Sequence, residues 1–470
     1  MTKQKMMLFI LTLTPLFVAM HLFGFTLNYY FFQDDWFNFN ITNINSIKDY
    51  LNFFAFRDDI IAYRPLVLQT QYFLFRSIFG LNAFALRVIN FSLLFISYIL
   101  VMYLARRILK NSKSALFTAA LWVTSSFHYM NLGMINYHLW GTVSWLITFL
   151  LFMGFLETKK KTFYLLSIVL YLVSLGIWEF AVSWPIIGTA YIIYVKRLKI
   201  IITFKIFSPF YLITTVYLII RHFLVAHLSI IEYQVAFNLD SIKALFWYIL
   251  WALNVPEEFK KQIADNLIIF RAEFLRDYWQ LVSITLIGAI LLIILGIFYP
   301  CYKAFRSKTH INFKLMIFFL FWFGVAIFPA LLLPNHNFMM YLTLPSLALY
   351  LMISYLTFKA RNKYLSYVIF SLWIILSLIT VRFYKINMFS SVAQRVSEDF
   401  VINMKRNYPN LQPNSIVYYP LPFRRDQQAL LNQNAIQALY KDQTINIFYT
   451  YGSMIKFWKS TNEKRPVLLY

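Results

Sequence analysis

The stretch that decides the fold is residues 7–26, MLFILTLTPLFVAMHLFGFT, which leads into residues 31–40, FFQDDWFNFN. About 20 apolar residues are enough to cross a bilayer as one helix. Lys3 and Lys5 precede the run, as in a signal peptide, but the run has a full span length and no small-residue cleavage site ends it. We therefore expect a retained first span, followed by an acidic loop outside the membrane.

The composition extends this reading to the whole chain. Of 470 residues, 60% are hydrophobic and 20% are aromatic, whereas soluble domains are about 45–50% apolar. This excludes an ordinary soluble protein and predicts an all-α polytopic membrane protein. Apolar runs of about 20 residues predict eleven spans. They lie near residues 7–26, 86–105, 115–133, 138–156, 162–178, 180–195, 206–224, 280–300, 313–333, 338–358 and 364–383.

The basic residues predict how the chain is oriented. The net charge is +24, and six short segments between spans hold 20 of the 43 basic residues, with Glu157 as the single acid beside them. These segments are residues 3–5, 106–113, 159–161, 196–205, 303–314 and 359–363. Short cytoplasmic loops carry such an excess. We expect a multi-pass cell-membrane protein with a cytoplasmic N-terminus and an extracytoplasmic C-terminus, and no nucleic-acid partner.

Eleven crossings divide the chain into a membrane domain and a tail. The membrane domain, residues 1–384, has two large outer loops, 26–86 and 227–279. The second loop contains the apolar stretch Leu245–Leu253, which is too short to cross and is typical of an interfacial helix.

Residues 385–470 form the tail, which is less apolar than the membrane domain. Two β-like runs, Ser415–Pro420 and Thr444–Tyr451, flank a polar helical stretch near Gln427–Tyr440. We expect a small α/β domain outside the membrane.

Asp34 and Asp35 form an acidic pair directly after the first span. Adjacent carboxylates repel each other and are costly in a dry setting. The pair is therefore either a base or cation site at the membrane surface, or a solvated loop or helix N-cap. A paired acid can hold Mg²⁺ or Mn²⁺, and the sequence leaves a metal requirement open.

Basic side chains on the outer side are candidates for binding an anion. Arg64 stands before Pro65, and proline holds its predecessor extended, so this guanidinium either clamps a phosphate or reaches lipid headgroups. Arg221 and His222, at the outer end of a span, either bind an anion or lie at the interface.

Two further positions carry polar groups close to apolar runs. Glu179 lies between two spans and is costly there unless it has a partner or reaches the outer water. Asn335 and His336 lie in a turn before the span that contains Tyr341. That histidine is either solvated, or binds phosphate or relays a proton.

Together these motifs resemble the GT-C superfamily of membrane glycosyltransferases. They are the acidic pair, the Arg-Pro-Leu of Arg64 about 30 residues later, Glu179 before a Pro-ended span, and a polar turn leading to Tyr341-x-x-x-Pro345. Within the superfamily the chain is similar to the protein O-mannosyltransferase and aminoarabinose-transferase branch and to bacterial relatives of the TMTC-type mannosyltransferases. The resemblance covers the layout of residues 1–380.

The resemblance implies transfer of a sugar, with inversion, from a polyprenyl-phosphate donor to a glycan, lipid or protein acceptor on the outer face. Asp34 or Asp35 would be the general base, and Arg64, helped by Arg221 or His336, would bind the donor phosphate. Supporting positions would be Asp58, Asp59, Glu179, His222, Asn335 and Tyr341.

Two positions differ from that branch. The TMTC-like proteins tend to have Arg before the Tyr-containing span, where this chain has Asn337 and Phe338, and they commonly have Lys where Trp178 precedes the embedded acid. The alternatives are a multi-pass lipid or solute transporter, and a ligase or polymerase of lipid-linked glycans.

Overall fold

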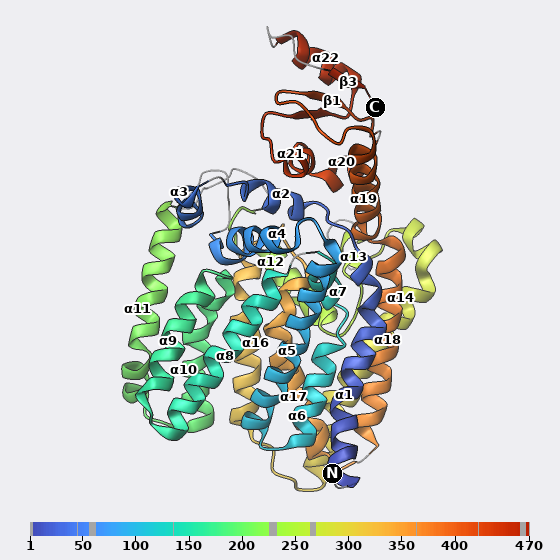
Figure 1. Cartoon of the computed structure of the whole chain (residues 1–470). Helices are drawn as coiled ribbons and strands as arrows, with labels where there is room; N and C mark the ends of the chain where they lie inside the picture. Colours follow the sequence, from blue (N-terminus) through green and yellow to red (C-terminus); the bar gives the residue numbers. More distant parts are fainter. Residues whose placement is uncertain are drawn as a thin grey trace.

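The computed structural model describes residues 3–44, 46–55, 63–134, 136–224, 233–263, 269–362, 364–421, 423–460 and 467–469. Figure 1 shows a bundle of long helices with the N-terminus at one end and the C-terminal elements stacked beyond the other. In these ranges six helices are long and apolar enough to cross a membrane: residues 83–109, 137–158, 200–223, 272–306, 313–331 and 365–387. The chain thus has the all-α architecture of a membrane protein.

The first half of the bundle alternates long helices with short 3₁₀ or π segments, which are labelled η. In order, it contains α1 (Lys3–Phe23), η1 (Gly24–Asn28), α2 (Asp34–Ile41), α3 (Ile47–Leu51), η2 (Asn52–Phe54), η3 (Pro65–Thr70), α4 (Gln71–Phe79), α5 (Ala83–Leu109), α6 (Ser112–Val123), α7 (His128–Gly133), α8 (Tyr137–Thr158), α9 (Lys161–Leu175), η4 (Glu179–Ser183), α10 (Trp184–Ala190), η5 (Tyr191–Lys196) and α11 (Ile200–Leu224).

The second half of the bundle continues in the same way. It contains α12 (Leu239–Trp251), α13 (Glu258–Lys261), α14 (Ala272–Ile293), η7 (Ile294–Phe298), α15 (Tyr299–Arg306), α16 (Phe313–Leu331), η8 (Met339–Thr343), α17 (Pro345–Lys359) and α18 (Leu365–Asn387). The apolar stretch 245–253 lies mostly in α12, as a helix of 13 residues.

Prolines stand at the start of three helical segments near one end of the bundle. Pro65, Pro185 and Pro345 each stand in the first turn of a helical segment. Proline is tolerated there because its missing N–H is not needed. The short turns η4 and η8 come just before the helices that Pro185 and Pro345 start. These turns hold two of the candidate residues, Glu179 and Tyr341.

The tail contains a small parallel sheet flanked by helices. It comprises α19 (Phe389–Asn407), β1 (Ile416–Tyr418), α20 (Arg424–Leu430), α21 (Asn434–Tyr440), β2 (Asn446–Phe448), α22 (Tyr451–Ser460) and β3 (Val467–Leu469). The strand order is β2-β1-β3, with Val417 opposite Ile447 and Leu468. The two predicted β-like runs contain β1 and β2.

The tail packs on the outer loop that carries the acidic pair. A second apolar core joins aromatic side chains of residues 31–39 and α4 to α19, α21 and the sheet. Its members include Phe31, Trp36, Phe39, Phe75, Phe400 and Ile436. The Trp36 indole N–H donates to Ser397 Oγ at 2.7 Å, and the Gln33 N–H donates to the Ala429 carbonyl at 2.8 Å. The tail therefore holds α2 in place.

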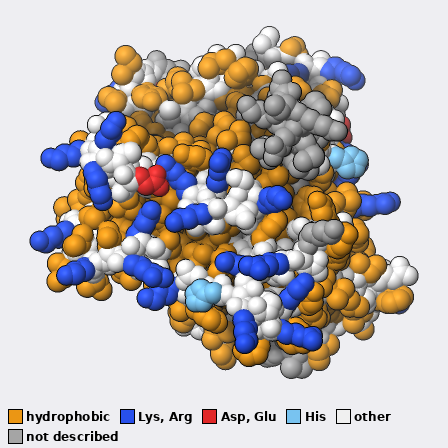
Figure 2. Space-filling model, turned by 90° about the horizontal axis from the view of Figure 1, so that it is seen from below, with side chains coloured by type: hydrophobic (Ala, Val, Ile, Leu, Met, Phe, Trp, Pro, Cys, Tyr) orange, Lys and Arg blue, Asp and Glu red, His pale blue; other side chains and the backbone are white. Residues whose placement is uncertain are grey.

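The opposite end of the bundle is basic. Figure 2, viewed from the N-terminal end, shows many Lys and Arg side chains and very few carboxylates. The basic segments named above fall at the ends of α5, α8, η5, α15 and α17. Arg107 pairs with Glu157 at 3.0 Å. The basic residues from which the orientation was predicted thus lie at one end of the bundle.

Candidate active site

The acidic pair occupies the first turn of α2. The preceding Gln33 has a φ of 50°, a left-handed conformation that is uncommon for a residue with a side chain. This turn brings Asp34 and Asp35 to the N-terminus of the helix, where exposed backbone N–H groups favour negative charge. Consecutive helical residues point in different directions, so the two carboxylates have different surroundings.

Asp35 is fully buried and its carboxylate is fully engaged. Arg87 Nη2 lies 2.9 Å from Asp35 Oδ2, and the Tyr72 hydroxyl donates to Asp35 Oδ1 at 2.6 Å. The Phe32 N–H also donates to Oδ2, at 3.4 Å. Neither oxygen is open to a substrate. Of the two residues expected as base, Asp35 is therefore placed as a structural anchor.

Arg87 extends this anchor to the surrounding backbone. Its guanidinium donates to the carbonyls of Tyr29 at 3.2 Å, Tyr30 at 3.0 Å and Met134 at 3.0 Å. The arginine thus ties α5 to the segment before α2 and to the end of α7. Sequence reasoning missed it, although an arginine inside a predicted apolar span is itself a signal that a partner lies nearby.

Asp34 is only partly buried, and no hydrogen bond to its carboxylate is found within the described ranges. Burial raises the pKa of Asp34 to about 6, with a further rise from the charge of Asp35 and a reduction from Arg64. A carboxyl group with a pKa near 6 is mostly ionised at neutral pH and is a far better proton acceptor than an ordinary aspartate. Asp34 is therefore suited to act as a general base.

Arg64 and Glu179 meet beside Asp34 as a two-pronged ion pair. Arg64 Nε donates to Glu179 Oε2 at 2.6 Å, and Nη2 donates to Oε1. The Arg64 guanidinium carbon also lies 4.0 Å from the centre of the Tyr137 ring. Glu179 therefore has the partner that its apolar surroundings demand, and Arg64 is held at the outer end of the bundle by a carboxylate and an aromatic face.

Aromatic residues close this side of the site. The Tyr341 ring stacks on Phe180 at 5.3 Å and meets the edge of His138 at 5.3 Å. The ring centres of His336 and Tyr341 lie 6.2 Å apart. Burial lowers the pKa of His336 to about 4. His336 is therefore neutral at pH 7. It can share a hydrogen bond with a phosphate oxygen but does not supply the positive charge expected of a phosphate-binding residue.

Glu257, which was not predicted as a site residue, holds the backbone just before Tyr341 in place. Its carboxylate accepts the Met339 N–H at 2.7 Å, and its own N–H donates to the Tyr384 hydroxyl at 2.8 Å. Burial raises the pKa of Glu257 to about 7, and the charge of Glu258 adds to this. The sequence did contain a signal for this residue, because Glu257 and Glu258 are adjacent acids in the 227–279 loop, just as Asp34 and Asp35 are adjacent in the first loop.

An apolar groove of about 540 Å³ opens between η3, α9 and α11. Its walls are formed by aliphatic side chains that include Leu66, Leu172, Leu175 and Val216, and it also contacts Tyr63, Tyr217 and Arg221. Arg221 Nη1 lies 3.5 Å from the Tyr217 hydroxyl. We call it the lipid-side groove. It runs beside Pro65 and Gly176, the neighbours of the Arg64–Glu179 pair.

Four predicted supporting residues remain. Asp58 and Asp59 lie outside the described residues. His222 is exposed, with its ring beside Phe223, and Asn335 is exposed in its turn.

The donor set does not favour a metal held by the acidic pair. Both oxygens of Asp35 are already engaged by Arg87, Tyr72 and a backbone N–H, so Asp34 would be left as a single ligand. Among the described residues no three His, Cys, Asp or Glu side chains gather as a cation site.

Comparison with known proteins adds no relative. No protein-family model matches this chain, and no curated protein matches it.

Proposed function

We propose that this protein is a membrane glycosyltransferase that moves a sugar from a polyprenyl-phosphate donor to an acceptor on the outer face. One observation carries the proposal. Asp34 is a partly buried carboxylate with a pKa near 6 that is lowered by the charge of Arg64, and the residue after Arg64, Pro65, lines an apolar groove. This combination supplies a base, an anion partner and a place for a lipid chain in one site.

The proposal includes the finer architecture predicted from the sequence. Residues 1–384 would cross the cell membrane eleven times, with the basic end and the N-terminus in the cytoplasm. The tail, residues 385–470, would be a small α/β domain outside the membrane. The acidic pair and the Arg64–Glu179 pair would then lie at the outer surface.

The lipid-side groove would hold the start of the donor's prenyl chain. Its volume of about 540 Å³ is in the range of ligand pockets, roughly 300–1,000 Å³. Aliphatic walls suit a hydrocarbon, and Arg221 in the lining suits the phosphate at its end, with Arg64 next to the lining residue Pro65. On donor binding, the Arg64 guanidinium would turn one of its N–H groups from Glu179 to a phosphate oxygen.

The transfer step follows from these placements. Asp34 accepts the proton of an acceptor hydroxyl while that oxygen forms a bond to the anomeric carbon from the face opposite the phosphate. The bond from the anomeric carbon to the phosphate oxygen breaks, and its electron pair leaves with the phosphate. Arg64 stabilises the negative charge that develops there, which is commonly the largest contribution in such reactions. The sugar is transferred with inversion, and Asp34 later releases its proton to water.

A transporter for lipids or solutes is the second candidate, because the lipid-side groove alone would serve it equally well. A third is a ligase or polymerase of lipid-linked glycans, which uses the same chemistry with a larger donor. Formation of a glycosidic bond by the wild type, and its loss in Asp34 variants, separates transfer from transport, because a transporter forms no such bond.

The test uses the full chain in lipid nanodiscs with radiolabelled polyprenyl-phosphate sugars and membrane-extracted acceptors. We expect label in a glycoconjugate, and a loss of at least about 100-fold in Asp34→Asn. Asp240→Asn is the control, because Asp240 is an exposed carboxylate that pairs with Lys243 across 3.1 Å at the surface. No transfer by the wild type from any donor in the set, or equal transfer by Asp34→Asn, would contradict the proposal.

A further inference from the structure

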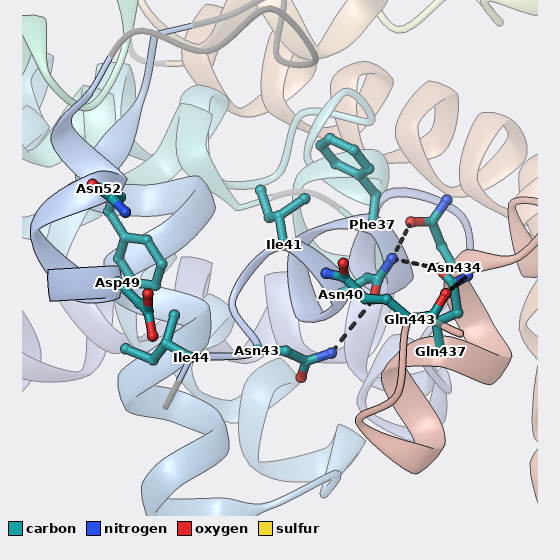
Figure 3. A pocket seen from close by; sticks show the side chains of 11 residues that line it. Phe37, Asn40, Ile41, Asn43, Ile44, Asp49, Asn52, Asn434, Gln437 and Gln443 are labelled. Atoms are coloured by element: carbon teal, nitrogen blue, oxygen red, sulfur yellow. Dashed lines mark hydrogen bonds between the residues drawn. The ribbon is translucent and has the colours of Figure 1, made fainter. Parts of the chain in front are cut away.

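A second groove lies on α2, between the first outer loop and the tail, with a volume of about 460 Å³. Figure 3 shows its two walls, one from α2, α3 and η2 and the other from α21 and the segment before β2. Six amide side chains line it: Asn40, Asn43, Asn52, Asn434, Gln437 and Gln443. We call it the amide groove.

The lining residues favour a neutral, hydroxyl-rich ligand. Amide groups have N–H donors and a carbonyl acceptor, which match the mixed donor and acceptor character of sugar hydroxyls. The amides of Asn52 and Gln443 are exposed and offer these groups to a ligand. Among the described residues that line it, Asp49 is the one charged side chain. Arg76 and Lys441 line the adjoining pocket, and Arg76 is engaged there, since its Nη1 donates to Asn43 Oδ1 at 2.7 Å. The described lining itself therefore suits a neutral ligand better than an anion. Phe37 and Phe53 add apolar faces against which the C–H face of a sugar ring can pack.

Part of the amide groove is rigid before any ligand arrives. Asn40 Nδ2 donates to Asn434 Oδ1 and to Gln437 Oε1, both at 3.0 Å, and so joins the two walls. Asn43 Nδ2 donates to Asn40 Oδ1 at 3.4 Å. Fixed polar groups cost less entropy on binding than mobile ones. Asn52 and Gln443, on opposite walls, are exposed and can turn their amides to a ligand.

The amide groove is aligned with the proposed base. Residues three and seven positions apart lie on one helix face, so Phe37 and Ile41 share the face of α2 that carries Asp34. Phe37 is about 4.5 Å further along the helix axis, at a rise of about 1.5 Å per residue. A chain of sugars in the amide groove would therefore end close to the Asp34 carboxylate.

We propose that the amide groove binds a neutral glycan, which makes the acceptor a carbohydrate rather than a lipid or a protein. The assignment as an acceptor site rests on the proposed transferase function, whereas glycan binding itself does not. The terminal sugar hydroxyl would be presented to Asp34, and the tail would contribute one wall of the acceptor site.

Binding is tested first, with no chemistry involved. Saturation-transfer NMR on the full chain in nanodiscs would use neutral di- and trisaccharides of glucose, galactose, mannose and N-acetylglucosamine as probes. We expect at least one of them to bind, and to bind about tenfold more weakly to the double variant Asn52→Ala/Gln443→Ala, which loses two hydrogen bonds. Asn410→Ala/Gln412→Ala removes one exposed Asn and one exposed Gln outside the groove and should bind like the wild type.

Asp34→Asn separates this proposal from the proposed function. It leaves the amide groove intact, so it should bind the same glycans while transferring no sugar. One outcome is glycan binding by every protein except the groove double variant, with no sugar transfer even by the wild type. That outcome would support the amide groove as a glycan site and contradict the proposed transferase function. No binding by any glycan of the set, or equal binding by the two double variants, would overturn the amide groove as a glycan site.

Discussion

Two ion pairs lie at the end of the bundle that carries the tail, and they differ in their access to water. The Asp35–Arg87 pair, here called the closed pair, has side-chain exposures of 0% and 0%. The Arg64–Glu179 pair, here called the open pair, has exposures of 10% and 19%. Both join an outer loop to a long helix or its turn. The closed pair is sealed from water, whereas the open pair is partly exposed and Arg64 precedes Pro65, which lines the lipid-side groove.

The difference shows how one short acidic motif can serve two purposes. A buried ion pair is costly to form but very costly to break, so it fixes the geometry around it. A pair at the edge of a groove can exchange one of its bonds for a ligand. Asp35 therefore positions α2, and Asp34, one residue earlier, is left free to react beside the open pair.

Removing the cation of the closed pair should have the largest effect. Arg87→Ala leaves the Asp35 charge buried without its partner, and we expect a loss of about 3–5 kcal/mol of stability. Thermal unfolding in detergent measures this. Arg107→Ala is the control, because the Arg107–Glu157 pair is more exposed, and it should lose about 1 kcal/mol or less. An Arg87→Ala protein as stable as Arg107→Ala would remove the distinction between the two pairs.

Removing the cation of the open pair should affect transfer more than folding. In Arg64→Ala the leaving phosphate has lost its principal cation, and we expect kcat to fall by about 10²–10³. Arg64→Lys should recover part of the rate, since lysine keeps the charge but not the two-pronged geometry. Radiolabel transfer and thermal unfolding on the same samples check this. A large loss of stability with normal transfer per folded molecule would reverse the roles of the pairs.

Weakening the closed pair without removing a charge should give an intermediate effect. Tyr72→Phe deletes the hydroxyl that donates to Asp35 Oδ1 at 2.6 Å. A hydrogen bond to a charged group contributes about 1.5–3 kcal/mol, and we expect a loss of stability in that range. Denaturant unfolding quantifies it. Tyr50→Phe, in the exposed helix α3, serves as the comparison and should leave stability unchanged within about 0.5 kcal/mol.

The pH dependence of transfer should include the ionisation of Asp34. Its pKa is raised to about 6, so the basic form is present above pH 6 and is lost as the pH falls through that value. At pH 5 the rate should be about tenfold below its plateau, since one pH unit below a pKa leaves about a tenth of the group ionised. A pH profile of kcat tests this. A rate that stays constant down to pH 4.5 would exclude Asp34 as the base.

The sequence predicted the helical segments and the loops that form the candidate site, but not the separate roles of the residues within it. Apolar runs identify helical segments because burial in a membrane requires about 20 such residues, and the prolines identify where three of them begin. The separate roles of Asp34 and Asp35 depend on Tyr72 and Arg87, which lie 37 and 52 residues further along the chain than Asp35. No local pattern reports a contact across such a separation.

The tail shows a second limit of sequence reasoning. The strands β1 and β2 lie within predicted β-like runs, whereas β3, Val467–Leu469, was not predicted. The amphipathic helix α19 was not predicted either, although its apolar face contributes Phe400 and Met404 to the core that holds α2. Those residues have their partners in the first outer loop, more than 300 positions away in the chain.

Asp34 and Asp35 are adjacent, but we propose different roles for them, one in catalysis and one in holding the structure. A paired comparison of Asp34→Asn with Asp35→Asn tests this most directly. Sugar transfer and thermal unfolding would be measured on both proteins at matched expression, beside the wild type. We predict that Asp34→Asn unfolds like the wild type but transfers no sugar, whereas Asp35→Asn is clearly destabilised and its folded fraction still transfers. Full transfer by Asp34→Asn, or a wild-type stability of Asp35→Asn together with loss of transfer, would contradict this account.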